Sequence, residues 1–459
     1  MRLNILHTND IHSNFENFSK IVTKIKELRD ENTIILDAGD FADFKRIELQ
    51  GTDGLAAMEL LEYAGYDALT VGNNETFQGL DILKFMSENT KIPLLSSNMN
   101  RLDFAPIGNV KKSIILNKNG LRILVIGASP DLGPFNELMG FALEDYLEAI
   151  EREIKVNESN YDLCIFLSHL GMDKDKEIAE KINGIDIIIG GHFHILMEKP
   201  EIVNDKIIFT SGAYGENLGM LSIEVNEHKV KLLESKNIPI SQWEESSEVL
   251  EIVKNNRQKA INNLSVPIYK IDRDLWHDVV EESPMTNLLA DALRDVLKCE
   301  IGLINSGVIN GGIKQGNVSA KKIIELCPSP LNPTSFKIQG KYLLEALSNS
   351  LDTDYCYADG KGPGFRGKYV GRLHVSNVII EHNGRMISKV YINGELLDTE
   401  RFYTVASSDY LQRGSGYESL RNNTDVTYNK EYLRDTLKEY MEKSEFVERA
   451  FIDRWIIKE

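Results

Sequence analysis

The chain has 459 residues, which is too long for one ordinary hydrophobic core and favours two domains. Its formal net charge of -18 argues against general binding to nucleic acids or anionic membranes, because such binding needs clustered lysines and arginines. The sequence has no long apolar run, no visible signal peptide and four cysteines without C-x-x-C spacing, so we expect a cytoplasmic protein with reduced thiols.

The first half of the chain alternates short apolar strands with helical stretches. Strand cores such as 34–37, 123–128 and 185–189 are apolar on both faces, which is typical of a sheet covered on both sides. This pattern predicts a layered α/β domain. Strands are expected within 2–8, 33–40, 67–73, 92–98, 122–129, 161–171, 185–194 and 206–215, and helices within 17–32, 54–65 and 81–89.

The second half begins after a polar, helical stretch at 236–265, which we interpret as a connector between domains. A mixed α/β unit is expected from 266 to 459, with a helix at 286–298 and strands within 301–307, 335–340 and 401–408. The stretch 358–368 carries four glycines and is expected to form a loop.

Polar residues follow the ends of the strands expected in the first half. Ligands bind at the carboxyl ends of strands in open α/β sheets, and carboxylates and imidazoles are common ligands of divalent metals. The pattern therefore predicts a metal site at one edge of the sheet. Its candidate residues are Asp10 and His12 in HTNDIH, Asp40 in DAGD, Asn73 and Asn74 in VGNNETFQG, His169 in LSHLG, and His192 and His194 in GGHFH.

Each of these motifs also has a structural interpretation. A lone D-x-H is usually a turn with a surface histidine, and the two side chains of H-x-H can point apart on an extended backbone. Asp37 is expected to tie its own loop, and the asparagine pair could form a turn. The occurrence of all these motifs together favours the metal site, because four of the nine histidines fall at predicted strand ends within one domain.

In this order, the motifs resemble the calcineurin-like metallophosphoesterase fold. In the second half, NLLADALRD, LINSG and LQRGSGY resemble the C-terminal domain of bacterial and animal 5'-nucleotidases. The resemblance implies a four-layer α/β/β/α domain at 1–235, a helical linker at 236–265 and a substrate-binding domain at 266–459. It also implies two divalent metal ions (manganese, zinc, iron or cobalt) and hydrolysis of a phosphate ester by metal-activated hydroxide. By that match, Asp10, His12, Asp40 and His194 hold the first metal, and Asp40 (bridging), Asn73, His169 and His192 hold the second.

The second asparagine departs from this family. The family places a histidine at the position of Asn74 and an acidic residue at the position of Phe77, and that histidine assists the reaction. An asparagine amide can donate a hydrogen bond to a phosphoryl oxygen but cannot supply a proton. Losing a general acid typically costs about 10²–10⁴ in rate, and less for a good leaving group.

The second half departs from the family as well. Pro284 and Asn310 stand where the family has arginines, and Leu331 aligns best with a phenylalanine that stacks on the base. Residues expected to bind substrate are the retained Asn305, Tyr410 at the position of the other stacking aromatic, and Arg366 and Arg413, which could replace the lost arginines or be solvated surface cations. His277 and His374 are the histidines of this half that could replace the acid, although a lone histidine is more often packed or exposed.

The sequence therefore predicts a dimetal phosphoesterase that acts on a small phosphorylated substrate. Nucleoside monophosphates, 2',3'-cyclic nucleotides and nucleotide-sugar diphosphates are the substrate classes of the family, and the sequence does not choose among them. The alternative is a nucleotide- or metabolite-binding protein with little turnover, because the histidine dyad and the arginine pair are absent. Oligomeric state stays open.

Overall fold

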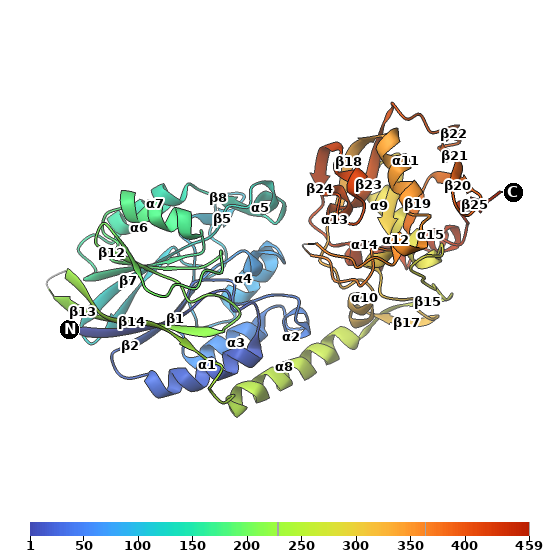
Figure 1. Cartoon of the computed structure of the whole chain (residues 1–459). Coiled ribbons are helices and arrows are strands. Elements are labelled where there is room, and N and C mark those ends of the chain that lie inside the picture. The colour runs from blue at the N-terminus through green and yellow to red at the C-terminus, as the bar shows by residue number, and fades with distance from the viewer. Residues whose placement is uncertain (227–228, 363, 459) are drawn as a thin grey trace. The chain divides into compact units, whose positions relative to one another are not determined.

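The computed structural model describes residues 1–226, 229–362 and 364–458, and the chain divides into two compact units, 1–263 and 264–459 (Figure 1). Residue 363 of the predicted glycine-rich loop lies outside the described residues.

The first unit contains two six-stranded sheets. In the first sheet the central strands run parallel, and β13 and β14 add an antiparallel edge. Its order is β14 (Lys229–Pro239), β13 (Asn217–Asn226), β1 (Arg2–Thr8), β2 (Thr33–Asp37), β3 (Ala68–Thr70) and β4 (Leu94–Leu95).

The second sheet has four parallel strands between two antiparallel edge strands. Its order is β11 (Glu201–Val203), β12 (Lys206–Phe209), β10 (Ile187–Gly190), β9 (Leu163–Ser168), β7 (Leu121–Ala128) and β6 (Ser113–Lys118).

The two sheets pack face to face, and helices cover their outer faces. Side chains alternate along each strand, so Ile5 of β1 lies in the core between the sheets while Leu6 packs in the core under the helices. Figure 1 shows the resulting layers, which confirm the predicted α/β/β/α arrangement. The helices of the first sheet are α1 (Phe15–Leu28), α3 (Leu55–Ala64) and α4 (Leu80–Glu88), and those of the second are α6 (Tyr146–Val156) and α7 (Met172–Lys181). Shorter elements are α2 (Ile47–Gln50), η1 (Asn74–Thr76), β5 (Met99–Arg101), α5 (Pro134–Leu138) and β8 (Phe141–Leu143).

The predicted connector holds the end of β14 and the helix α8 (Ser247–Ser265). The first turns of α8 pack on the first unit, where Val249 is fully buried and Asn256 donates a hydrogen bond to Glu59 at 2.9 Å.

The second unit is a mixed α/β structure, as predicted. Its five-stranded sheet has the order β19-β16-β23-β18-β24, in which only β16 and β23 run parallel, and a four-stranded sheet has the order β22-β21-β20-β25. Helix α9 is buried along most of its length and forms the centre of this core. The elements are β15 (Pro267–Ile271), α9 (Pro284–Leu297), β16 (Ile301–Asn305), η2 (Ser306–Val308), β17 (Gly316–Ser319), α10 (Ala320–Leu326), β18 (Pro333–Gln339), α11 (Gly340–Asn349), α12 (Thr353–Cys356), β19 (Leu373–Ser376), β20 (Val378–His382), β21 (Ile387–Ile392), β22 (Glu395–Leu396), β23 (Phe402–Ser408), α13 (Asp409–Gln412), η3 (Glu418–Arg421), β24 (Asn423–Tyr428), α14 (Leu433–Tyr440), α15 (Ser444–Arg449) and β25 (Trp455–Ile457).

Candidate metal centre

Loops after five parallel strands converge at one edge of the first unit. The loops after β1, β2 and β3 come from the first sheet, and those after β9 and β10 come from the second. Because the carboxyl ends of parallel strands meet at one edge, the polar residues predicted as ligands are brought together there.

A first group of possible ligand atoms consists of Asp10, His12 and His194, whose atoms lie within 4.8 Å of one another. The Nε2 atoms of the two histidines are 3.0 Å apart. Asp10 Oδ1 lies 3.4 Å from His194 Nε2 and 3.9 Å from His12 Nε2. Both nitrogens and the carboxylate therefore face one small volume.

A second group consists of Asp10, Asp40 and His169, which are all buried. His169 Nε2 lies 3.3 Å from Asp40 Oδ1 and 3.8 Å from Asp10 Oδ1. Its Nδ1 contacts the carbonyl oxygen of Ala38 at 2.7 Å, which leaves Nε2 facing the carboxylates. Such a contact fixes the orientation of an imidazole that binds a metal.

Two carboxylates thus lie between the histidines. Asp10 belongs to both groups, and Asp40 also reaches the first group because its Oδ2 is 3.8 Å from His12 Nε2. The resemblance assigns the shared carboxylate to Asp40 alone. In the structure both aspartates are near enough to both groups to serve as the shared ligand.

Of the other two predicted ligands, His192 borders the second group. The ring of His192 lies 5.2 Å from that of His169, and its backbone N–H donates to both oxygens of Asp10 at 3.0 and 3.1 Å. His192 and His194 therefore lie beside different groups, on a backbone with positive φ angles rather than on an extended strand. Asn73 stands at the start of η1, directly before Asn74.

The donor set fits divalent cations. Among the described residues, the buried atoms His169 Nε2 and Asn73 Oδ1 have no hydrogen-bond partner. Buried polar atoms in native proteins are rarely left without one, and such exceptions mark functional positions or bound ions. Imidazole nitrogens and carboxylate or amide oxygens suit manganese, zinc, iron and cobalt.

Strained backbone is concentrated in this cluster. Positive φ angles are uncommon for residues other than glycine and gather at functional sites. Five of the seven predicted ligands have them: Asp10 (52°), His12 (48°), Asp40 (57°), His192 (76°) and His194 (56°).

The electrostatics favour cation binding. Burial lowers the pKa of His12 and of His192, which keeps their imidazoles in the neutral form that binds metals. Burial acts in the same direction on His169, but the carboxylates of Asp40 and Asp10 outweigh it and raise its pKa to about 10. A cation at this point would take the place of that proton.

Glu75 is a supporting residue that sequence reasoning missed. It is fully buried, and its carboxylate accepts hydrogen bonds from the backbone N–H groups of Asp40 (3.1 Å), Ala42 (2.8 Å) and Gly72 (2.8 Å). It therefore joins the loops after β2 and β3. Its position directly after the asparagine pair is the sequence feature that could have pointed to this role.

Two further contacts hold the aspartates. Asn9 donates from its side chain to Asp10 Oδ2 at 2.7 Å and accepts from Ser211. At Gly72 only glycine fits, because a Cβ there would lie 2.1 Å from Asp40 Oδ1. Asp37 ties its own loop, as expected, by accepting from the backbone N–H of Gly39.

Asn74 contacts a predicted ligand directly. Its backbone N–H donates to Asp40 Oδ1 at 2.8 Å, and its side-chain amide donates to Asp40 Oδ2 at 2.6 Å. Phe77, at the position where the resemblance leads us to expect an acidic residue, packs edge-on against Phe135 with ring centroids 5.6 Å apart.

Comparisons with known proteins show the family of this chain. The calcineurin-like phosphoesterase model matches residues 3–196, and the model of the 5'-nucleotidase C-terminal domain matches 260–421. The chain belongs to the 5'-nucleotidase family of calcineurin-like metallophosphoesterases. It is a metal-dependent phosphoric ester hydrolase by this membership.

Relatives of this hydrolase cover nearly all of it. An uncharacterized metallophosphoesterase, YunD of Bacillus subtilis (strain 168), is 29% identical over 95% of this chain and 98% of its own length. A 5'-nucleotidase of Diplobatis ommata is 25% identical over 94% of this chain and 87% of its own length. The solved NAD nucleotidase of Haemophilus influenzae has the same fold, with a TM-score of 0.67 at 16% identity over the whole of both chains. Within the described part of the hydrolase, no helix has the length and apolar character needed to cross a membrane.

In the second unit, three of the four predicted substrate residues, Asn305, Tyr410 and Arg366, lie in or beside the segment 364–370. Asn305 is fully buried, and its side-chain amide donates to the carbonyl oxygen of Val370 at 2.6 Å. Tyr410 is also fully buried, and the ring of Phe365 stacks on it with centroids 4.6 Å apart and an interplanar angle of 21°. Phe365, which sequence reasoning did not single out, therefore covers one face of Tyr410.

The two predicted arginines are exposed. Arg413 forms an ion pair with Asp409 at 2.8 Å, and Arg366 donates to the carbonyl oxygen of Phe365 at 3.1 Å. His374 is a packed core residue, because it is fully buried and its Nε2 accepts from the backbone N–H of Ser283 at 3.0 Å. His277 lies 3.2 Å from the hydroxyl of Thr286.

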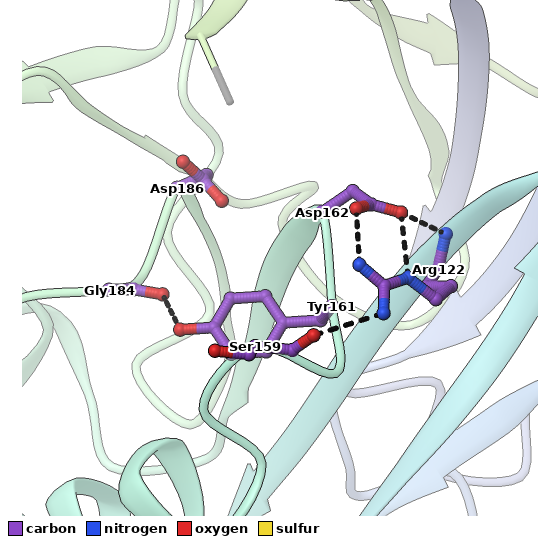
Figure 2. A pocket seen from close by; sticks show the side chains of 6 residues that line it. All are labelled: Arg122, Ser159, Tyr161, Asp162, Gly184 and Asp186. Carbon is purple, nitrogen blue, oxygen red and sulfur yellow. Dashed lines mark hydrogen bonds and ion pairs between the residues drawn. The ribbon is translucent and has the colours of Figure 1, made fainter. Parts of the chain in front are cut away.

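A separate pocket of about 490 Å³ lies at the opposite ends of the second sheet's strands. Figure 2 shows hydrogen bonds from Arg122 to Asp162 and Ser159, and from Tyr161 to Gly184. Arg122 pairs with Asp162 at 2.7 Å, and the Tyr161 hydroxyl donates to Gly184 at 3.2 Å. It shares no lining residue with the metal centre.

Proposed function

We propose that this protein hydrolyses a phosphate ester of a nucleotide or a related small phosphorylated metabolite, in nucleotide catabolism in the cytoplasm. The observation that carries the proposal is the convergence of carboxylates and imidazoles within 4.8 Å at one sheet edge, where the buried atoms Asn73 Oδ1 and His169 Nε2 have no hydrogen-bond partner among the described residues.

We assign the seven converging residues as ligands of two divalent cations. Asp10, Asp40, His12 and His194 would hold one, and Asp40, Asn73, His169 and His192 the other, with Asp10 near enough to assist. When bound, such ions bind phosphoryl oxygens and make hydroxide available at neutral pH. Manganese, zinc, iron and cobalt are the candidate metals.

The chain's own residues set the rest of the chemistry. The buried carboxylates fix the cations, and the backbone bonds of Glu75 fix the Asp40 loop. Asn74 occupies the position of the family's histidine, so the first unit offers an amide there in place of a proton donor. The hydrolysis rate of esters with good leaving groups should therefore be reduced least by the substitution.

The second unit is proposed to bind the rest of the substrate. Asn305, Tyr410, Arg366 and Arg413 are the candidates, and the first three lie in or beside the segment 364–370. Exposed guanidinium groups suit a phosphate, whereas Tyr410 becomes available to a ring only if Phe365 moves.

The test is phosphate release by the purified protein with Mn²⁺, using nucleoside monophosphates, cyclic nucleotides and an aryl phosphate, with Asp40→Asn as control. We expect turnover of one natural class, with loss of about 10³-fold or more in the control because a shared ligand is weakened. Turnover that is equal in Asp40→Asn would contradict the assignment.

A second candidate is a nucleotide- or metabolite-binding protein with little turnover. Asn74 in place of the histidine, and its amide engaged with Asp40, are the observations that favour it. Tight binding of a nucleotide without release of phosphate at any Mn²⁺ concentration would select this alternative.

A further inference from the structure

Tyr214 lies in the loop that joins β12 to β13, beside the metal centre. Its backbone is held on both sides: its N–H donates to the carbonyl oxygen of Asp10 at 2.7 Å, and its carbonyl oxygen accepts from the Asn17 side chain at 2.9 Å. Its φ angle is 57°, the left-handed conformation shared by five of the predicted ligands. A strained aromatic residue so fixed is a candidate for function.

The ring of Tyr214 packs against two predicted ligands of the first cation. Its centroid lies 5.4 Å from the His12 ring and 5.3 Å from the His194 ring, with interplanar angles of 39° and 78°. The side chain is nevertheless 43% exposed. Tyr214 therefore has imidazoles on one side and solvent on the other, at a place that a substrate must reach.

Its hydroxyl is available as a donor. The described residues give it no hydrogen-bond partner. The amide of Asn74, by contrast, already donates to Asp40. A phenol donates a hydrogen bond without carrying charge, and a donor held close to a phosphoryl group stabilises the charge that develops there.

We propose that Tyr214 donates a hydrogen bond from its hydroxyl to an oxygen of the bound phosphate ester, and that its ring positions the imidazoles of His12 and His194. This inference rests on the proposed hydrolysis at the metal centre. It gives the substrate a contact from the β12–β13 loop that the motifs do not contain.

Two variants separate the two roles. Tyr214→Phe keeps the ring and removes the donor, whereas Tyr214→Ala removes both. With Mn²⁺ and the best natural substrate, we expect Tyr214→Phe to lower kcat/KM about tenfold or more while the Mn²⁺ Kd from calorimetry stays within about twofold. Tyr214→Ala should also weaken Mn²⁺ binding about fivefold or more, because the imidazoles lose their support.

Tyr63→Phe is the matched control, since Tyr63 is 38% exposed on α3 and bonds to Lys26. A kcat/KM of Tyr214→Phe within about twofold of the wild type would overturn the donor role. An unchanged Mn²⁺ Kd in Tyr214→Ala would overturn the positioning role.

A failure of the proposed hydrolysis would be visible separately, as no phosphate release from any ester by the wild type. In that case the probe is inorganic phosphate, titrated into the Mn²⁺-loaded protein. Weaker phosphate binding by Tyr214→Phe, about fivefold or more, would support the donor role, and equal binding by the two proteins would overturn it.

Discussion

Asn74 donates two hydrogen bonds to Asp40, one to each carboxylate oxygen. The bond from the side chain is the shorter, at 2.6 Å, and both residues belong to loops that Glu75 joins. Asn74, where the resemblance to the family leads us to expect a histidine, thus donates to a predicted metal ligand. Its first effect should be on metal binding.

Asn74→Ala removes the side-chain bond to Asp40 and leaves the backbone bond in place. We expect the Mn²⁺ affinity to fall by about 10–100-fold, as is typical when a residue that orients a ligand is removed. Calorimetric titration of the chelator-treated protein measures it. If the Mn²⁺ Kd stays the same while kcat falls, Asn74 acts on the substrate instead.

Phe365→Ala tests whether Tyr410 can bind a ring. Two rings with centroids 4.6 Å apart leave no room for a third, and stacking on an aromatic side chain is worth about 1–3 kcal/mol per base. We expect the variant to lower KM for AMP about fivefold or more while KM for ribose 5-phosphate, which lacks the base, changes little.

The control for this comparison is Phe402→Ala, because Phe402 is an exposed residue of β23. Near-ultraviolet circular dichroism shows whether the core around Tyr410 survives. Equal changes in KM for both esters would mean that Tyr410 serves only as a core residue.

His374 should make the folded protein sensitive to acid. Burial lowers its pKa to about 3, below the value of about 6.5 for an unfolded chain. The folded state therefore binds fewer protons below pH 6.5, and stability is lost as the pH falls, by about 1.4 kcal/mol per pH unit. The loss extends down to about pH 3.

His374→Gln cannot take up this proton. Between pH 7 and 5, the unfolding free energy of the chelator-treated variant should fall by about 2 kcal/mol less than that of the wild type. Urea unfolding at the two pH values measures the difference. Parallel losses in both proteins would show that His374 does not control the response.

Periodicity and the order of the motifs were sufficient to predict a layered α/β domain and the convergence of the loops that carry the predicted ligands, whereas the four-layer arrangement followed from the family resemblance. Apolar strand cores such as 185–189 required cover on both faces, and parallel strands place their following loops at one edge. The expected strands and helices of both halves are present in the structure.

Contacts between loops could not be predicted from periodicity and motif spacing. Nothing in the spacing of Phe365 and Tyr410 indicates that their rings stack, and Tyr214 carries no motif of its own. The bonds between Asn74 and Asp40 likewise depend on how two loops meet. Tertiary packing decides these pairs, and local sequence patterns do not encode it.

The ligand loops come from both sheets of the sandwich: Asp10, Asp40 and Asn73 follow strands of the first sheet, and His169 and His194 follow strands of the second. A cation bound by residues of both sets of loops would link the two sheets at one edge, as a covalent cross-link does. The folding stability of the first unit would then follow the concentration of free metal, rising by about 1.4 kcal/mol for each tenfold excess over Kd. The cations proposed for catalysis would thereby also stabilise the packing of the two sheets against each other.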